Sequence, residues 1–130
     1  MNTESMALSK LRIGESKEWS GRKIAITGAR GSLGRSLIRS FRSKGAFVIG
    51  LTHQLISEES DLKKSPNEWV QWECGKEENL KEIFQNIDIL ILNHGINKSG
   101  IISNKAINES IEINALSTWR LIEEFERIAL

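Results

Sequence analysis

The sequence contains no tyrosine, one cysteine and one proline among its 130 residues. A single cysteine excludes a disulfide framework and fits a reducing compartment, so we expect a cytoplasmic protein. No uninterrupted apolar run approaches the roughly 20 residues needed to cross a bilayer, and the first residues lack the apolar core of a signal peptide. We therefore expect no membrane segment. Without tyrosine, any mechanism that needs a phenol must obtain it from outside this chain.

Charge is unevenly distributed, although the formal net charge is only +1. Residues 21–57 hold seven basic and no acidic residues, whereas residues 58–130 hold eight basic and fourteen acidic residues. This asymmetry suggests an anionic partner near the basic segment. The spacing of Arg35, Arg39 and Arg42 equally fits a solvated helix face. No aromatic residues alternate with the basic ones, so we expect no nucleic-acid partner.

Apolar patterning predicts strands that alternate with helices after a flexible arm over residues 1–18. The predicted strands are 23–27, 46–51, 69–72 and 88–92, and the predicted helices are 32–44, 76–86 and 106–130, with a loop or short helix over 53–67. Alternating elements with near-continuous apolar strands indicate an α/β domain over residues 19–130, built on a parallel sheet covered on both faces. Right-handed crossovers then give a partial, doubly wound sheet of the Rossmann type, in the order 3-2-1-4.

The strongest motif is TGARGSLG, Thr27–Gly34, which follows a predicted strand and opens a predicted helix. Gly28 permits the tight turn, Gly31 leaves the backbone open to a pyrophosphate, and Gly34 lets the helix pack on the sheet. Free N–H groups at the helix start favour phosphates. The predicted coenzyme-binding residues of this loop are Thr27, Gly28, Arg30, Gly31, Ser32, Leu33 and Gly34. The alternative is a glycine-rich turn without a ligand; a Walker loop is excluded because no Gly-Lys-Ser/Thr follows.

TGARGSLG resembles the cofactor loop of the short-chain dehydrogenase/reductase superfamily. DILILNHGI, residues 88–96, is similar to the DILVNNAGI segment of that family. IEINALSTWRL, residues 111–121, resembles its next helix, with Asn114 at the position of the active-site asparagine. The motifs span about residues 20–130. A narrower resemblance is to the subgroup named bifunctional sterol desaturase/short chain dehydrogenase. The resemblance implies hydride transfer between a nicotinamide and a carbonyl or alcohol.

The sequence departs from the family pattern at two motifs. Its loop fits TGxxGxxG rather than TGxxxGxG, and Leu92 and His94 replace the first Asn and the Ala of NNAG. The resemblance assigns Asn93 and Gly95 to the coenzyme ribose. His94 either adds a hydrogen bond to the coenzyme or fills space. No metal site is expected, since the only other histidine is His53 and no Cys/His spacing matches one.

The end of the second predicted strand bears on the choice of coenzyme. In dinucleotide-binding folds an acid there holds the ribose diol and disfavours a 2′-phosphate. Here Thr52 and His53 follow, with no acid before Glu58. Arg30 is placed to face a 2′-phosphate, so we favour NADP, with NAD as the alternative. The resemblance also puts Glu73 where the family has an Asp that contacts adenine.

The family performs its chemistry with a Tyr, a Lys four positions later and a Ser, all beyond the helix that carries the asparagine. This chain has no YxxxK motif. We therefore expect the coenzyme-binding half of an oxidoreductase, truncated before the Tyr/Lys segment, inactive alone, and acting on a small carbonyl or alcohol only when completed. The alternative is a non-catalytic dinucleotide-binding module or sensor.

Such a half would leave two apolar surfaces uncovered, the strand 88–92 and part of the last helix. The apolar stripe of that helix consists of Ile107, Ile111, Ala115, Trp119, Ile122, Phe125 and Ala129. Its spacing of three and four places these residues on one face of a helix, and the resemblance implies that this face serves core and subunit packing in family members. Because an exposed apolar sheet edge invites pairing, we expect self-association through this edge or this helix.

Overall fold

The computed structural model describes residues 18–54, 65–98, 100 and 102–129. Its centre is a parallel sheet of four strands in the order β3-β2-β1-β4, which confirms the predicted topology. The strands are β1 (Lys23–Thr27), β2 (Phe47–Thr52), β3 (Glu68–Gln71) and β4 (Ile89–Ile91). All lie within two residues of the predicted bounds. The predicted arm lies outside the described residues except for residue 18, as does most of the loop 53–67.

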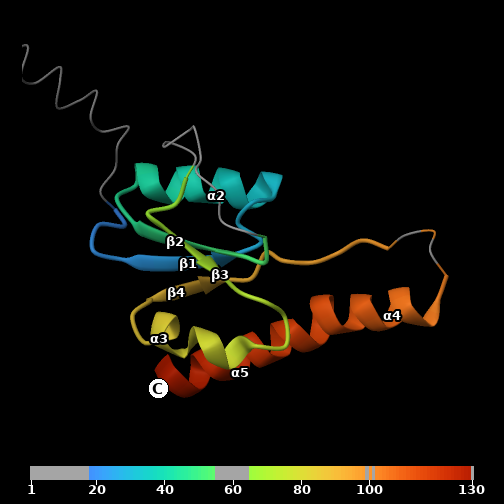
Figure 1. Ribbon diagram of the computed structural model, residues 1–130. Helices are drawn as coiled ribbons and strands as arrows, with labels where there is room; N and C mark the ends of the chain where they lie inside the picture. Colours follow the sequence, from blue (N-terminus) through green and yellow to red (C-terminus); the bar gives the residue numbers. More distant parts are fainter. Residues whose placement is uncertain (1–17, 55–64, 99, 101, 130) are drawn as a thin grey trace, which may run out of the picture.

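Helical elements cover both faces of this sheet (Figure 1). α2 (Ser32–Ser43) covers one face, and η2 (Glu77–Leu80), α3 (Lys81–Phe84) and α5 (Ser117–Ala129) cover the other. Side chains alternate along each strand, so two separate cores form. Ile24, Ile26, Ile38 and Val48 lie in the core beneath α2, and Ala25, Ile49, Leu51, Leu80, Phe84 and Leu121 lie in the core beneath α5.

The last helical region departs from the single helix predicted over 106–130. It begins with α4 (Asn104–Ile111), continues as a π-helical turn, η3 (Glu112–Leu116), and ends as α5. The Ser103 side chain caps α4 by accepting a hydrogen bond from the Ala106 amide at 3.1 Å. α4 projects beyond the sheet, whereas α5 lies against it (Figure 1). Asn114 lies within the π-helical turn, a feature frequent at functional sites.

The apolar stripe predicted for this region mostly faces away from the sheet. Ile107, Ile111, Trp119 and Ile122 are exposed, and α5 instead packs on the core through Leu121, Phe125 and Ile128. Part of the stripe is therefore uncovered, as expected for the last helix. The prediction of one continuous helix was wrong, because a π turn adds a residue to the helical repeat and shifts the faces of α5 relative to those of α4.

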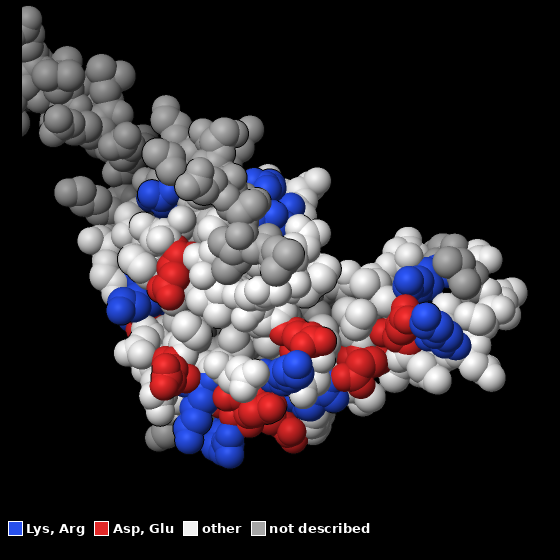
Figure 2. Space-filling view, in the orientation of Figure 1, with Lys and Arg blue, Asp and Glu red and all other residues white. Residues whose placement is uncertain are grey.

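The surface charge follows the asymmetry of the sequence. Over α2, at the top of Figure 2, the charged side chains in view are basic, whereas both signs mix over η2 and α5 at the bottom. Arg35 Nε donates to the Arg30 carbonyl at 3.2 Å, and Arg42 Nη1 donates to the Ser65 carbonyl at 2.7 Å. These two arginines therefore stabilise local structure. Among the described residues, no helix has the length and apolar character of a bilayer-spanning segment.

Substitution of neighbouring residues tests the orientation of α5. Leu121 is fully buried and Ile122 is 38% exposed. Leu121→Ala should lower the free energy of unfolding by about 2–5 kcal/mol, because it leaves a cavity in the core. Ile122→Ala should cost less than about 1 kcal/mol, since it removes a partly solvated side chain. Urea unfolding followed by circular dichroism measures both; equal losses would contradict this orientation.

Candidate functional site

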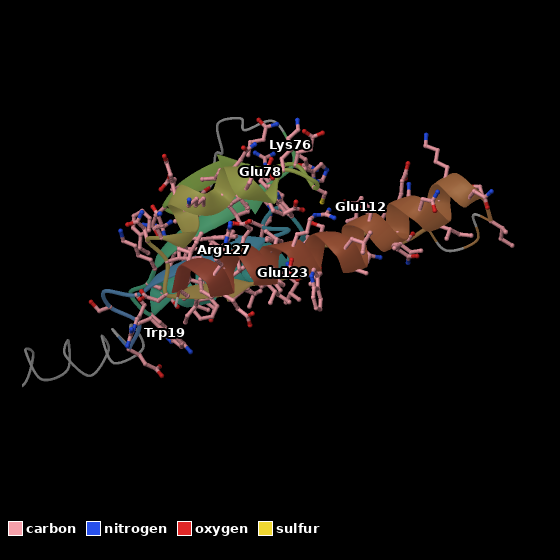
Figure 3. All side chains as sticks on the ribbon, turned by 90° about the horizontal axis from the view of Figure 1, so that it is seen from below. Trp19, Lys76, Glu78, Glu112, Glu123 and Arg127 are labelled. Atoms are coloured by element: carbon pink, nitrogen blue, oxygen red, sulfur yellow. The ribbon has the colours of Figure 1, made fainter. Side chains whose placement is uncertain are left out.

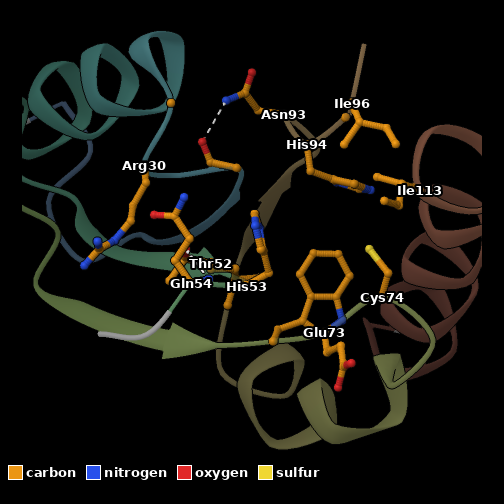
Figure 4. Close-up of a pocket in the computed structure, with 15 residues that line it drawn as sticks. Arg30, Thr52, His53, Gln54, Glu73, Cys74, Asn93, His94, Ile96 and Ile113 are labelled. Atoms are coloured by element: carbon orange, nitrogen blue, oxygen red, sulfur yellow. Dashed lines mark hydrogen bonds between the residues drawn. The ribbon is translucent and has the colours of Figure 1, made fainter. Parts of the chain in front are cut away.

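A cavity of about 510 Å³ opens at the carboxyl ends of the four strands (Figure 4). It lies at the switch point of the sheet, where the chain leaves β1 toward one face and β4 toward the other. Its walls are Gly28, Arg30, Gly31, Leu51, Thr52, His53, Gln54, Trp72, Glu73, Cys74, Asn93, His94, Gly95, Ile96 and Ile113. Open α/β sheets bind their ligands in this crevice.

The turn from β1 to α2 forms one wall and depends on two glycines. Gly28 has a φ of +61°, and a Cβ there would lie 2.2 Å from the Asn93 carbonyl oxygen. At Gly34 a Cβ would lie 2.3 Å from the Gly28 oxygen. Neither position accepts a side chain. The backbone at Gly28 therefore lies directly against the segment after β4. The first turn of helix α2, at Gly34, packs against the backbone of Gly28 and Ala29.

Gly31 is different, because a Cβ there would meet only the Gly28 oxygen, at 3.5 Å. It is the N-cap of α2, no side chain caps this helix, and its first turn holds no acidic residue. Ser32 and Leu33 are exposed beside it. The amide groups and the positive dipole end of α2 are thus available to an anion next to the cavity.

Arg30 lies over an aromatic platform beside this turn. Its guanidinium carbon is 5.2 Å from the centre of the Trp69 ring, a cation–π arrangement. Trp69 in turn occupies the space above Gly50, where a Cβ would lie 2.7 Å from the indole. Arg30 Nε and Nη2 are buried and have no hydrogen-bond partner among the described residues. Buried guanidinium donors of this kind favour an anionic acceptor.

The ends of β2 and β3 supply the opposite wall. The Thr52 hydroxyl accepts a hydrogen bond from the Gln54 amide at 3.1 Å, and His53 is exposed. Glu73 is exposed and forms an ion pair of 2.7 Å with Lys76, whose hydrogen bond lowers the pKa of the Glu73 carboxyl. Among residues 52–54 and 65–74, the acidic residues are Glu68, at the start of β3, and Glu73. No carboxylate therefore follows β2 directly.

Asn114 organises the segment that follows β4. Its Oδ1 accepts a hydrogen bond from the Ile96 amide at 2.8 Å, and its Nδ2 donates to the Ile96 carbonyl at 3.0 Å. A Cβ at Gly95 would lie 3.1 Å from this Oδ1, so glycine permits the close approach. The backbone N–H of Asn93 donates a hydrogen bond to the Thr27 hydroxyl at 2.8 Å. The motif after β4 is thereby fixed to both β1 and η3.

The structure brings most of the predicted site residues to one crevice. Those that line it are Gly28, Arg30, Gly31, Thr52, Glu73, Asn93, His94 and Gly95. Thr27 and Gly34 are buried behind it, and Asn114 contacts it through Ile96. Sequence reasoning missed Gln54, Trp72, Ile96 and Ile113. Two of these could have been found from their positions in the sequence: Trp72 directly follows β3, at the edge of the sheet where ligands bind, and Ile113 directly precedes Asn114.

A buried carboxylate, Glu77 of η2, connects the segment after β3 to the start of α5 beside this crevice. The Glu77 side chain is 3% exposed and accepts hydrogen bonds from the Gly75 amide at 3.0 Å, the Ser117 hydroxyl at 3.0 Å and Arg120 Nε at 2.9 Å. Burial raises the pKa of Glu77, but these hydrogen bonds together outweigh it and hold the pKa below its ordinary value. Arg120 also pairs with Glu112 at the start of η3, labelled in Figure 3.

The parallel sheet, the glycine turn and the uncapped helix at the switch point define the class of protein. They are the features of a Rossmann-type dinucleotide-binding domain. Residues 24–130 match the NAD dependent epimerase/dehydratase family, and the chain belongs to that family.

Known proteins resemble both the sequence and the structure. The chain is 34% identical over 123 residues to the monoglucosyldiacylglycerol epimerase of Synechocystis, covering 93% of this chain and 30% of that protein. It is 27% identical over 120 residues to nodulation protein G of a Rhizobium species, covering 49% of that protein. The chain thus spans less than half the length of these relatives.

Solved structures agree. A short-chain dehydrogenase from Leptospira borgpetersenii with bound NAD+ is 30% identical and superposes with a TM-score of 0.69, over 85% of this chain and 47% of that one. A short-chain dehydrogenase from Shigella flexneri in complex with NADP superposes with a TM-score of 0.66 at 17% identity, over 87% and 55%. The resemblance to the short-chain dehydrogenase/reductase superfamily is confirmed; the sterol desaturase subgroup stays a prediction.

Removal of the buried carboxylate should destabilise the domain. Glu77→Ala leaves the Ser117 hydroxyl and the Gly75 amide unpaired, so the free energy of unfolding should fall by about 1–3 kcal/mol. The adjacent Glu78 is exposed, and Glu78→Ala should change the free energy of unfolding by less than about 0.5 kcal/mol. Urea denaturation at pH 7 measures both, and a small loss for Glu77→Ala would show that the network is not stabilising.

The hydrogen bonds to Glu77 should also make the stability of the fold depend on pH. A carboxyl with a lowered pKa in the folded state stabilises the fold above its ordinary pKa of 4.5 and loses this contribution as the pH falls through the folded-state value. Unfolding midpoints should therefore fall more steeply below pH 4.5 for the unaltered chain than for Glu77→Ala.

Proposed function

We propose that this chain binds a nicotinamide dinucleotide in the crevice and forms the coenzyme-binding part of an oxidoreductase that transfers hydride to or from a carbonyl or alcohol. The observation that carries the proposal is the open amino terminus of α2, free of a side-chain cap and of acidic residues, beside a cavity at the switch point. Membership of a family described as NAD dependent supports it.

The residues present fit a dinucleotide. The cavity volume of about 510 Å³ falls in the usual range of small-molecule sites. The amides of Ser32, Leu33 and Gly34 would hold the pyrophosphate, since Gly31 presents no side chain beside them and Gly34 keeps the helix close to the turn. The Gly31 amide itself donates to the Gly28 carbonyl at 3.1 Å. Asn93 and Gly95 would lie along the ribose of the nicotinamide half. Glu73 would lie near the adenine.

The adenosine end favours a 2′-phosphate. Arg30 offers buried donors without partners, and the residues that follow β2, Thr52 to Gln54, carry no carboxylate to repel an anion. A dinucleotide with a 2′-phosphate would satisfy these donors with a charge-assisted hydrogen bond. We therefore propose that NADP binds more tightly than NAD.

Replacement of Arg30 tests this preference. Arg30→Ala should weaken NADPH binding by roughly 10-fold to 100-fold, the range of one charge-assisted hydrogen bond, and weaken NADH binding much less. Arg39→Ala removes an exposed arginine of α2 and serves as the control. Titration calorimetry with both coenzymes measures the affinities. Equal losses for the two coenzymes would contradict the assignment, and no heat from the unaltered chain with either would refute coenzyme binding.

A new acid at the end of β2 should reverse the preference. Thr52→Asp introduces a carboxylate where dinucleotide-binding folds hold the ribose diol, so NADH affinity should rise and NADPH affinity should fall. Thr52→Asn, of similar size without the charge, is the matched control. The ratio of the two dissociation constants reports the change, and an unaltered NADPH affinity would place the ribose elsewhere.

When bound, the nicotinamide supplies the hydride acceptor or donor. This chain supplies no tyrosine, so the phenol that the family resemblance implies for proton transfer at the substrate oxygen would come from outside these 130 residues. We propose that turnover by this chain alone is negligible. The β4 edge and the exposed side chains of α4 and α5 are the surfaces where further protein, including a second copy, would pack.

Epimerisation is a second candidate for the chemistry that this domain serves. The 34% identity to monoglucosyldiacylglycerol epimerase over nearly the whole chain favours it. Such a reaction would transfer a hydride from a carbinol carbon of the sugar to an oxidised nicotinamide and the hydroxyl proton to a base, and would return both so that the hydride reaches the opposite face of the carbon. A protein that contains this segment should then interconvert a monoglucosyl lipid and its epimer without net consumption of NADPH, whereas a reductase consumes it. Coenzyme binding without either activity would favour the non-catalytic module.

A further inference from the structure

His94 lies between two hydroxyl groups that belong to different parts of the coenzyme crevice. Its Nδ1 is 2.9 Å from the Thr27 Oγ1 at the end of β1. Its Nε2 is 3.3 Å from the Thr118 Oγ1 at the start of α5. The edge of the ring meets the Trp72 indole, with centroids 5.3 Å apart, and in Figure 4 the imidazole is directed at Ile113. Both ring nitrogens therefore have partners within the protein.

The neighbouring hydroxyl groups allow two arrangements of a neutral ring, in which either Thr27 or Thr118 donates to it. The Thr27 oxygen accepts a hydrogen bond from the Asn93 amide at 2.8 Å, and its single hydroxyl proton has two acceptors within reach. The Ile91 carbonyl is 3.3 Å away and the His94 Nδ1 is 2.9 Å away. Neutral imidazole side chains in water carry their proton mainly on Nε2; we assign this tautomer here, so that the Thr27 hydroxyl donates to Nδ1 and not to the Ile91 carbonyl. Nδ1 is then an acceptor, and the proton of the neutral ring is on Nε2.

The other side of the ring fits the same assignment. The Thr118 hydroxyl lies 3.3 Å from the Asn114 carbonyl, an oxygen that only accepts. With the proton on Nε2, Thr118 accepts a hydrogen bond from His94 and donates one to the Asn114 carbonyl. The donors run in one direction, from the Asn93 amide through Thr27, His94 and Thr118 to the Asn114 carbonyl.

We propose that neutral His94, with its proton on Nε2, is a positioning residue that holds the end of β1, where the glycine turn starts, against the start of α5, where Thr118 in turn binds the carbonyl of Asn114. This inference rests on the proposed coenzyme function and assigns that site a residue that sets its geometry. The segment after β4 is bound to Asn114 by two further hydrogen bonds, so the connection runs from the phosphate-binding turn to the nicotinamide side of the crevice.

The electrostatic surroundings agree with a neutral ring. Burial lowers the pKa of His94 below its ordinary value, against smaller opposing effects of the Ile113 carbonyl and the Glu77 carboxylate. Glu77 of η2 is the charged group that faces the ring among the described residues. β1 and the residue after β3 present Thr27 and Trp72, neither of which titrates near neutral pH. The imidazole therefore stays uncharged at pH 7.

Nuclear magnetic resonance tests the tautomer without coenzyme. His53→Gln leaves His94 as the only histidine of the full chain. A long-range proton–nitrogen correlation spectrum of this variant at pH 7 should show a ring with a bare Nδ1 and a protonated Nε2. A ring protonated on Nδ1, or on both nitrogens, would overturn the proposal.

A matched pair at Thr118 tests the link to the coenzyme. Thr118→Val keeps the shape but removes the hydroxyl, so NADPH affinity should fall roughly fivefold to tenfold, the effect of about one hydrogen bond. Thr118→Ser keeps the hydroxyl and should bind within about twofold of the unaltered chain. In the His53→Gln background, Thr118→Val should also mix the two tautomers, which a simple loss of packing would not do.

The outcomes separate the two proposals. Equal NADPH affinity in the unaltered chain and Thr118→Val would overturn the role of His94 while leaving the coenzyme site intact. No binding of NADPH or NADH by the unaltered chain would refute the coenzyme site and the role of His94 in it. The resonance experiment would then show only whether the hydrogen-bonded connection exists.

Discussion

The crevice exists because the backbone after β1 and the backbone after β4 touch. A Cβ at Gly28 would lie 2.2 Å from the Asn93 oxygen, closer than any side chain permits. The left-handed conformation at Gly28 turns the chain sharply into α2, and this contact sets the amino terminus of the helix at the switch point. The rest of the site follows from this approach. The helix dipole faces the cavity, and Arg30 reaches the platform of Trp69.

The second organising feature is the π-helical turn. It interrupts an otherwise regular helix where Asn114 must hold Ile96 with both atoms of its side-chain amide. Arg120 of α5 connects this turn to η2, because its guanidinium pairs with Glu112 at the start of η3 and with Glu77 of η2. The irregular turn is thus stabilised by an ion pair between the partly exposed Arg120 and the buried Glu77. A mutation in that pair would act on the crevice from a distance.

Much of the fold could be predicted from the sequence, because its signals are local. The strands are short apolar runs, and the glycine motif lies between the first strand and the first helix, so their order and the switch point follow from general rules of handedness. The comparisons confirm the superfamily that these motifs indicate. Most of the predicted site residues lie together for the same reason, since carboxyl ends of parallel strands share one edge.

The parts that could not be predicted depend on contacts between distant residues. The spacing of Ile107, Ile111, Trp119 and Ile122 predicts one face of a continuous helix, but it indicates neither the π turn nor the projection of α4, and all four side chains are exposed. Nothing near Glu77 in the sequence indicates that Ser117 and Arg120 would bind it. Likewise, the two partners of His94 lie 67 positions before it and 24 positions after it.

The placement of the indole rings has an optical consequence. Since the chain has no tyrosine, its ultraviolet emission comes from its four tryptophans. Trp72 forms part of the cavity wall, and Trp69 lies beneath the guanidinium of Arg30. A reduced nicotinamide absorbs where indoles emit, so a coenzyme in this cavity would quench these rings by resonance energy transfer. Binding of a reduced coenzyme could therefore be followed by the decrease in tryptophan fluorescence, without an added dye.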